Sequence, residues 1–370
     1  MAIKHASIDK FFLASVSVLT LFGFLIFLSA SLGLLTESGA SFSNIALKQG
    51  ISLILGILAF YLFSKFDYSW IRKYALFIFI GSVLVNLLLF VPQLSLYHGG
   101  ASRWLNIGLF SFQPSELLKI SFIIYLAAWI HFAKDKITSV KYGLLVYSIL
   151  MVILGALLLA QRDTDTLVII CATGIIMFFV AGVPLKQIFV TILLMVAIVV
   201  GVIFTRPYAM QRVKTFLNHN QDSQGAGYQI NQSLIAIGSG QVFGRGFGQS
   251  IQKFGYLPQP TDDSIFAVAA EEFGFAGSVV LISLYLLLAI SILRVSKQTK
   301  NVFGSYVVFG IAILVIIESF LNIAAMLGLI PLSGVPLLFV SHGGSALIIS
   351  LAAMGIVANV SKKSYNSTTN

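Results

Sequence analysis

The chain has 370 residues, of which 58% are hydrophobic and only 10% are charged, and its formal net charge is +10. Soluble domains carry about 25% charged residues, so this composition excludes a soluble globular protein, because one globule of this length cannot bury so much apolar surface. The surrounding solvent must therefore be lipid.

Ten apolar runs of near-spanning length follow one another along the chain. Each is predicted to be a helix, because lipid leaves an open segment no other way to satisfy its backbone. We therefore expect one all-α polytopic membrane domain over residues 1–370, with a long extracytoplasmic loop at about 205–262 and a polar, disordered tail at about 361–370. The eighth run is long and should begin with a non-spanning turn. The runs cover about 10–34, 45–64, 73–92, 114–132, 142–160, 164–182, 186–205, 264–293, 304–328 and 334–360.

The distribution of lysine and arginine predicts the orientation. With the N-terminus inside, most basic residues fall on the cytoplasmic side, whereas the short outer loops and adjacent helix ends hold only Lys48, Arg103, Lys119 and Arg162. This bias predicts that both termini are cytoplasmic. The net charge of +10 is thus mainly topological and does not indicate a nucleic-acid partner. The first run is expected to be an uncleaved anchor.

The first unusual stretch is HGGASRWLNIGLFSFQPSELLKI, residues 98–120. An outer loop carrying Arg103 and Trp104 precedes a helix that should begin at Pro114. Glu116 and Lys119 share one face of that helix. One interpretation is an interfacial ion pair with Trp104 as an aromatic anchor. The other is that Arg103 and Lys119 face an anionic ligand while Glu116 orients one of them.

The second unusual stretch is QRDTDTL, residues 161–167, at the outer end of the sixth helix. An Asp near a helix N-terminus is favourable on dipole grounds alone. Capping explains one Asp, but it explains Asp163, Asp165 and Arg162 together less well.

The third unusual stretch runs from residue 205 to residue 274. Ile230, Leu234, Ile235 and Ile237 recur on one helical face, which predicts an amphipathic helix on the outer leaflet. Five glycines between residues 238 and 248 then indicate a tight, close-packed loop. This glycine run is no nucleotide-binding motif, because neither a βαβ unit nor a Lys-Ser/Thr pair accompanies it.

Paired acids end the third stretch. Either Asp262 or Asp263 is a candidate N-cap for the eighth run. Glu271 and Glu272 lie about two turns further on. We expect one of them to face a cavity and hold an arginine; the alternative is an ion pair inside the bundle.

Two ionisable residues, Glu318 and His342, lie within the last apolar runs. Intramembrane ionisable residues are functional candidates, although a hydrogen-bonded structural role is the alternative. The stretch PLSGVPLLFVSHGGSAL, residues 331–347, predicts irregular backbone that lines a cavity.

Three motifs together resemble one bacterial family. They are GGASRWLNIGLFSFQPSELLKI, QGAGYQINQSLIAIGSGQVFGRGFGQSIQKFGYLPQPTDDSIFAVAAEEFGFAG and NIAAMLGLIPLSGVPLLFVSHGGSAL. In order and spacing they resemble the SEDS family (shape, elongation, division and sporulation) over nearly the whole chain. GQSIQKFGYLP is more similar to the division branch, FtsW, than to the elongation branch, RodA.

The resemblance implies a peptidoglycan glycosyltransferase that polymerises lipid II at the outer face of the bacterial cytoplasmic membrane. It also implies a class B penicillin-binding protein as the transpeptidase partner, together with other divisome or elongasome membrane proteins. By motif, the family's essential acid corresponds to Asp263. Its other motif positions correspond to Arg103 and Trp104, to Pro114, Ser115, Glu116 and Lys119, to residues 161–166 with the acid at Asp163, and to Gln211 and Arg212.

The chain departs from the family pattern at several motif positions. Arg162 stands in place of a usual Pro and Asp165 in place of a Gly, so these two could form a compensating pair. The other departures are Gln259 for Glu, Thr261 for His and His342 for Tyr.

The implied reaction is an inverting single displacement with a lipid pyrophosphate as leaving group. It needs one base to take the proton of the attacking hydroxyl. Asp263 is the expected base, which leaves Asp262 as the expected cap. The predicted pyrophosphate ligands are Arg103, Trp104, Lys119, Arg212 and Lys214, and the supporting acids are Glu116, Asp163, Glu271 and Glu272.

No metal-ligand spacing is present, and a divalent cation is only an open option, with Asp163 and Asp263 as its candidate ligands. Two rival functions remain. A lipid II flippase or other transporter fits ten spans with broken helices, and a non-catalytic division scaffold is the third reading.

Overall fold

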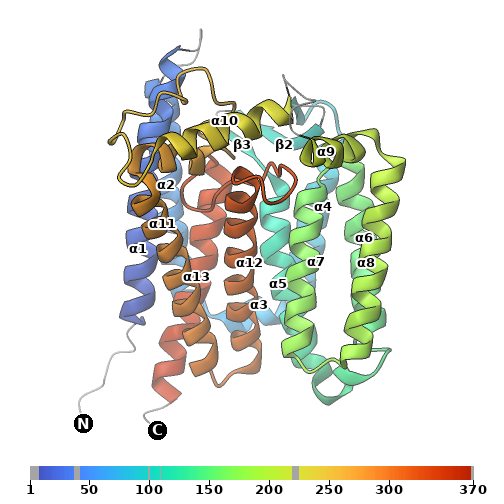
Figure 1. Ribbon diagram of the computed structural model, residues 1–370. Coiled ribbons are helices and arrows are strands. Elements are labelled where there is room, and N and C mark those ends of the chain that lie inside the picture. The colour runs from blue at the N-terminus through green and yellow to red at the C-terminus, as the bar shows by residue number, and fades with distance from the viewer. Residues whose placement is uncertain (1–7, 37–41, 99–100, 109, 219–224, 368–370) are drawn as a thin grey trace, which may run out of the picture.

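The apolar runs fold into a bundle of roughly parallel helices (Figure 1). The computed structural model describes residues 8–36, 42–98, 101–108, 110–218 and 225–367. Each of the ten predicted runs contains a helix. These helices are α1 (Lys10–Ser31), α2 (Phe42–Lys65), α4 (Ala75–Leu87), α5 (Pro114–Ala133), α6 (Leu144–Ala160), α7 (Thr164–Val180), α8 (Leu185–Thr205), α11 (Ile265–Gln298), α12 (Val302–Met326) and α13 (Gly344–Ser367).

Seven helical segments among the described residues are long and apolar enough to cross a membrane, and three shorter apolar helices accompany them. The shorter segments are Ala75–Phe90, Leu144–Ala160 and Thr164–Val180. The protein is therefore a multi-pass helical membrane protein. The short helix α3 (Tyr68–Lys73) connects α2 to α4.

Helix α12 lies at the centre of the bundle, where it packs against α5, α7, α11 and α13. In the most apolar stretch of α12, 67% of the residues are buried inside the bundle, whereas only 11% are buried in the corresponding stretch of α8. The chain thus places α8 at the edge with apolar side chains facing outward, as a lipid solvent requires.

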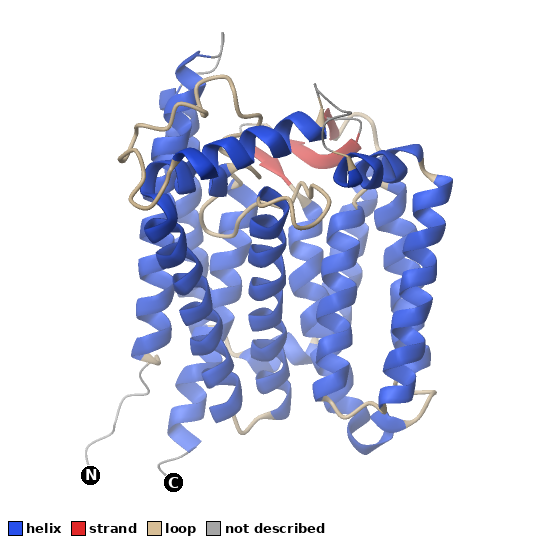
Figure 2. Cartoon of the chain, in the orientation of Figure 1, coloured by secondary structure: helices blue, strands red, loops and turns tan. Residues whose placement is uncertain are grey.

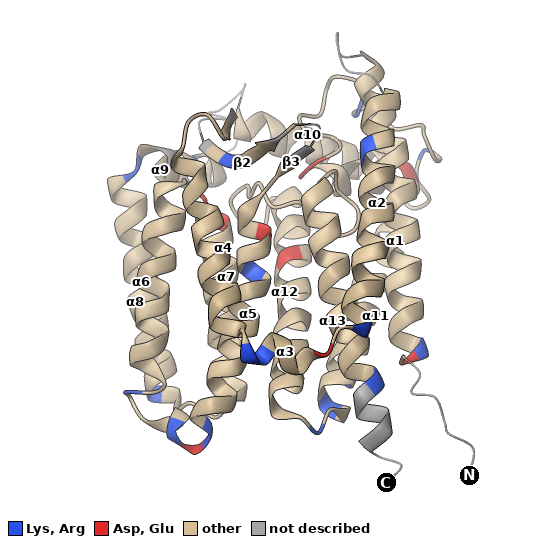
Figure 3. Cartoon of the chain, turned by 180° about the vertical axis from the view of Figure 1, so that it is seen from behind, with Lys and Arg blue, Asp and Glu red and all other residues tan. Residues whose placement is uncertain are grey.

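The two ends of the bundle differ. Helices α9 (Pro207–Leu217) and α10 (Ala226–Ser239) lie across one end, which we call the loop end (Figure 1). The first residues of α1 and the last described residues of α13 lie at the other, which we call the terminal end. Helix α10 is the predicted amphipathic helix, and it packs over α11 and α12. Lysine and arginine gather mainly at the terminal end (Figure 3).

A small antiparallel sheet covers the loop end where only a loop was predicted (Figure 2). Its strands β1 (Ser95–His98), β2 (Ala101–Ile107) and β3 (Phe110–Phe112) pair in sequence order. Trp104 pairs with Leu96, and Leu105 pairs with Phe112. The prediction missed the sheet because three to seven residues carry too short an alternation to outweigh the turn residues around them. Gly99 and Gly100 lie outside the described residues.

Helix α11 is interrupted at Gly274, where φ is 66° and ψ is −165°. A Cβ atom at Gly274 would lie 2.3 Å from the backbone N of Gly244. Only glycine permits this left-handed conformation and this close approach of two backbones. The eighth run was expected to begin with a non-spanning turn; it begins instead as a helix at Ile265 and is interrupted at Gly274.

The predicted start of the tenth helix and the predicted start of the disordered tail were both wrong. Residues 331–343 have the irregular backbone that their glycine and proline content predicts, so α13 begins at Gly344 and not near 334. The polar tail predicted from 361 is helical as far as Ser367, because a formed helix extends at little further cost. Lys362 also ties α13 to α2 by donating from Nζ to the Ser64 carbonyl at 3.2 Å.

Candidate functional site

Asp263 lies in the short loop between the glycine-rich segment and α11, at the loop end. The N-cap of α11 is Ser264, which makes no side-chain capping hydrogen bond. The N–H groups of Asp262 and Ser264 both donate to the Gln259 carbonyl, so the chain turns before the helix starts. Asp262 therefore lies too early to cap α11, and its predicted capping role is wrong. Its Oδ1 instead lies 3.4 Å from His342 Nδ1.

The Asp263 side chain is half-buried and faces α10. Gln229 on α10 donates from Nε2 to Asp263 Oδ1 at 3.1 Å and to Ser264 Oγ at 2.9 Å. Burial, followed by the negative charge of Asp262, raises the pKa of Asp263 to about 7, although hydrogen bonds from Gln229 and the backbone oppose the shift. A carboxylate with a pKa near neutrality is suited to accept a proton at neutral pH.

Arg103 on β2 reaches the start of α7. Its Nη1 lies 3.9 Å from Asp163 Oδ1, and its Nη2 donates to the Arg162 carbonyl. Asp163 caps α7 by accepting from the Thr166 N–H at 3.4 Å, as the capping interpretation expects. Its Oδ2 is buried and has no hydrogen-bond partner among the described residues. The neighbouring Trp104 is half-buried in the same strand.

Arg212 on α9 is held by Asp165 on α7. Its Nη1 lies 2.8 Å and 3.0 Å from the two carboxylate oxygens. Asp165 was expected to pair with Arg162; this is a correction, because α9 folds back over α7 and brings a cation that is remote in sequence. Lys214, in the last turn of α9, is exposed.

Glu116 and Lys119 on α5 form a buried cluster with Glu318 on α12. Lys119 Nζ lies 2.8 Å from Glu116 Oε1 and also contacts Glu318 Oε1. All three side chains are at most 4% exposed. Figure 3 shows the acidic positions of α5 and α12 in the half of the bundle near the loop end. Lys119 thus has two carboxylate partners inside the bundle.

Glu271 and Glu272 fix the glycine-rich loop onto α11. Glu271 accepts from Ser250 Oγ at 2.5 Å and from two backbone N–H groups of residues 251 and 252, and Arg245 Nε lies 3.3 Å away. Glu272 pairs with the buried Lys253 at 2.6 Å. Glu271 holds an arginine, as predicted, although it lines neither of the two hollows described below, and Glu272 forms the buried ion pair that was the alternative.

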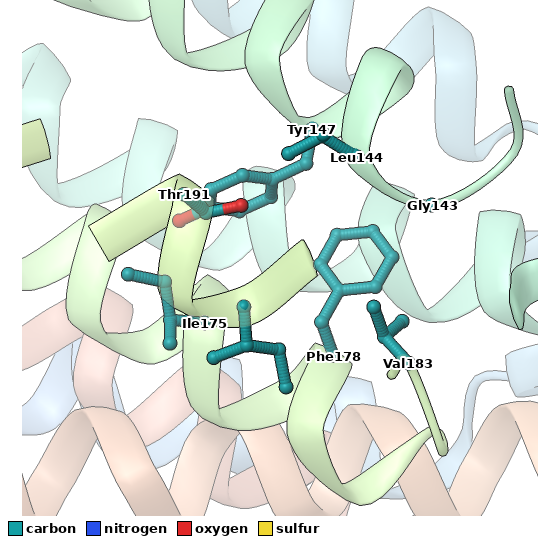
Figure 4. Close-up of a pocket in the computed structure, with 8 residues that line it drawn as sticks. Gly143, Leu144, Tyr147, Ile175, Phe178, Val183 and Thr191 are labelled. Atoms are coloured by element: carbon teal, nitrogen blue, oxygen red, sulfur yellow. The ribbon is translucent and has the colours of Figure 1, made fainter. Parts of the chain in front are cut away.

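Hollows within the described part of the bundle include two with different linings. One is bordered by Glu116, Lys119 and Glu318, by Ser350, and otherwise by apolar side chains of α5, α12, α13 and the irregular segment before α13. The other lies between α6, α7 and α8 and is lined by side chains such as Tyr147, Phe178 and Thr191 (Figure 4). The second hollow contains no charged side chain, so it offers no group for acid–base chemistry.

The donor set for a metal ion is poor. No group of three His, Cys, Asp or Glu side chains that could hold a metal ion occurs in the described part of the chain. Asp163 contacts Arg103, and Asp263 contacts Gln229. These contacts do not bring the two candidate metal ligands together. The participation of a divalent cation stays an untested prediction.

A family model for the cell cycle proteins FtsW, RodA and SpoVE matches residues 9–366. The chain belongs to the FtsW/RodA/SpoVE family. It is 37% identical over 355 residues to a probable peptidoglycan glycosyltransferase FtsW of Geobacter sp. strain M18, covering 96% of this chain and 97% of that one. It is 34% identical over 324 residues to stage V sporulation protein E of Bacillus subtilis, covering 86% and 87% of the two chains.

Solved structures of the FtsW/RodA/SpoVE fold superpose on the chain. One comes from a structure described as "Structural coordination of polymerization and crosslinking by a peptidoglycan synthase complex", with a TM-score of 0.80, 25% identity and coverage of 97% and 98%. The rod shape determining protein RodA of Thermus thermophilus superposes with a TM-score of 0.70 at 22% identity, covering 98% and 99%.

Three contact residues of this family member were not predicted from the sequence. Gln229 contacts the Asp263 side chain, and Asn322 on α12 donates to the Asp263 carbonyl at 2.8 Å. Lys253 fills the space beside Glu272. A glutamine on an amphipathic helix and an asparagine in an apolar span were visible as exceptions, but nothing in their spacing linked them to Asp263.

Proposed function

We propose that the protein is a peptidoglycan glycosyltransferase that polymerises lipid II. The observation that carries the proposal is the Asp263 carboxylate, half-buried at the loop end with a pKa raised to about 7. The names of relatives that cover nearly the whole chain support the same activity. Lipid II presents a sugar hydroxyl and a lipid pyrophosphate, and these need a base and nearby cations.

In the proposed reaction Asp263 takes the proton from the 4-hydroxyl of one sugar. The oxygen then attacks the anomeric carbon of a second sugar, and the bond to undecaprenyl pyrophosphate breaks. The attack inverts that carbon, so one base suffices and no covalent intermediate forms. The departing pyrophosphate is a weak base and needs no general acid; cations can stabilise its developing charge.

Arg103 and Arg212 are the proposed pyrophosphate ligands. Both lie at the loop end, and each is oriented by a carboxylate of α7. Guanidinium groups can bind phosphate oxygens in a bidentate manner. Lys214 is exposed near Arg212 on the same helix and could join them. The burial of Lys119 favours a different role, as the counter-charge of Glu116 and Glu318.

We infer that the chain crosses the bacterial cytoplasmic membrane ten times, with the loop end outside. The gathering of basic residues at the terminal end supports this orientation (Figure 3). A class B penicillin-binding protein is the proposed partner, since one superposed structure is described as a synthase complex that couples polymerisation to crosslinking. Similarity to FtsW relatives favours a role in division.

Reconstitution tests the activity. The purified protein and a class B penicillin-binding protein, placed in vesicles with labelled lipid II, should form glycan strands, and Asp263→Ala should abolish them. Asp135→Ala, at an exposed position of the terminal end, is the matched control and should leave polymerisation unchanged. Full polymerisation by Asp263→Ala would show that Asp263 is not the base. Activity that survives both Asp263→Ala and Arg103→Ala in cells would instead support a non-catalytic scaffold.

Transport of lipid II is the second candidate, and the buried cluster of Glu116, Lys119 and Glu318 favours it. Ionisable groups inside spanning helices mark transport pathways in many proteins. A transporter would move labelled lipid II between leaflets in the absence of polymerisation, and Glu318→Gln would slow that movement. Glycan formation without leaflet exchange excludes this candidate.

A further inference from the structure

Three successive carbonyl groups of the loop that carries Asp263 are bonded by separate donors. The Thr261 carbonyl accepts from the His342 N–H at 2.7 Å, and the Asp262 carbonyl accepts from Ser341 Oγ at 2.5 Å. The Asp263 carbonyl accepts from Asn322 Nδ2 at 2.8 Å. The irregular segment before α13 therefore holds the first two residues of this loop by their carbonyl groups, and α12 holds the third.

The side chain of His342 adds a fourth contact. Its Nδ1 lies 3.4 Å from Asp262 Oδ1, and its ring stacks on Phe27 of α1 with centroids 5.8 Å apart and an angle of 17° between planes. The ring is therefore fixed on one side by packing and on the other by a carboxylate. The side chains of His342 and Asp262 are 37% and 40% exposed, so water and substrate can reach them.

The two adjacent carboxylates thus have different partners. Asp262 lies beside the His342 ring, whereas Asp263 accepts a hydrogen bond from Gln229. Neighbouring like charges repel, and a carboxylate without a partner can take several rotamers. A contact that keeps Asp262 against His342 leaves the space beside Asp263 to the attacking sugar.

We propose that His342 is a positioning residue that, through Asp262, fixes the direction of the Asp263 carboxylate for the transfer reaction. The inference rests on the proposed function, and it assigns His342 no contact with the reacting atoms. A shift of about 1 Å in a reacting group can lower a rate by about a hundredfold. Loss of this contact should therefore reduce kcat by about tenfold to a hundredfold.

Two substitutions separate the two features of His342. His342→Phe keeps an aromatic ring that can stack on Phe27 but removes the nitrogen that faces Asp262. His342→Asn removes the ring and keeps an N–H donor near the position of Nδ1. We expect His342→Phe to lower kcat by at least about tenfold with the KM for lipid II within about twofold, because ground-state binding is retained. His342→Asn should recover most of kcat.

The assay uses the full chain with its penicillin-binding partner in vesicles and labelled lipid II as substrate. His131→Gln is the control, since this histidine lies at the end of α5 beside Arg72, away from the loop end. Each variant is first compared by size-exclusion chromatography and by copurification with the partner. If His342→Phe fails to fold, His342→Asn and Asp262→Ala still test the contact.

A double-mutant cycle completes the test. Because the proposed effect runs through one contact, Asp262→Ala combined with His342→Phe should be no slower than the slower single variant. Full activity of His342→Phe, or losses that multiply in the double variant, would overturn the proposal. If the wild-type protein formed no glycan at all, the proposed function itself would fail, and the two failures are thus distinguishable.

Discussion

The pair formed by Lys253 and Glu272 provides the most quantitative test of the structure. The two side chains are 0% and 1% exposed, and Nζ lies 2.6 Å from Oε1. Ser29 on α1 completes the cluster, with its Oγ 2.6 Å from the Glu272 carboxylate and 3.1 Å from Lys253 Nζ. The pair therefore joins the glycine-rich loop, α11 and α1 at one buried point.

Removal of Lys253 alone should be strongly destabilising. Lys253→Met keeps most of the side-chain volume but leaves Glu272 buried without its cation. Breaking a buried ion pair in this way costs about 3–5 kcal/mol of the free energy of unfolding. At about 2.1 cal/mol/K of unfolding entropy per residue, a chain of 370 residues shifts by about 1.3 °C per kcal/mol, so the midpoint of thermal unfolding should fall by about 4–6 °C.

The double substitution is the decisive comparison. Lys253→Met with Glu272→Gln removes both charges, and it should recover at least half of the lost stability, because the uncompensated charge is the main penalty. The midpoint is measured by thermal unfolding in detergent. The control is Arg245→Ala, whose side chain is 39% exposed and whose pairing with Glu271 should contribute at most about 1 kcal/mol. A double variant less stable than Lys253→Met would refute the charge argument.

Three further outcomes are expected. If Asp263 is the base, as proposed, polymerisation should rise with pH through its pKa of about 7, and Asp262→Asn should move this rise to lower pH by removing a like charge. A pH–rate profile decides, and an unchanged midpoint would exclude the coupling. Gly244→Ala should destabilise the protein, since its Cβ would meet the Glu272 carbonyl at 2.1 Å and its φ is +82°; equal melting midpoints would contradict this. Arg212→Ala should raise the KM for lipid II by at least about tenfold, because the lost phosphate contact should contribute at least about 1.4 kcal/mol to binding. An unchanged KM would mean that Arg212 only joins α9 to Asp165 of α7 and does not bind the substrate.

Much of the fold could be predicted from composition and periodicity. Each apolar run contains a helix, and the amphipathic pattern at Ile230 and its neighbours corresponds to α10. The β-sheet at the loop end and the helical tail could not be predicted. Short strands and helix ends depend on what they pack against, and a local pattern of a few residues does not contain that information.

The candidate site, like the fold, could be predicted only in part. Asp263 was selected as the base because its motif resembles a known family, and motif matching likewise selected Arg103 and Arg212; their roles stay predictions. The partner of each charge was harder to predict. Asp165 pairs with Arg212 and not with Arg162, and Lys119 contacts Glu318, which lies 199 positions away.

The sequence by itself determined the class of the protein and the approximate positions of its apolar helices, because the length and composition of an apolar run decide whether it can lie in lipid. Tertiary structure alone decided which groups meet at the loop end. Gln229, Asn322 and His342 reach the loop of Asp263 from three different segments, and such contacts exist only when helices distant in the sequence are packed together. Packing also withdraws Asp263 partly from bulk water, and this burial, together with the charge of Asp262 next to it in the sequence, raises its pKa to about 7.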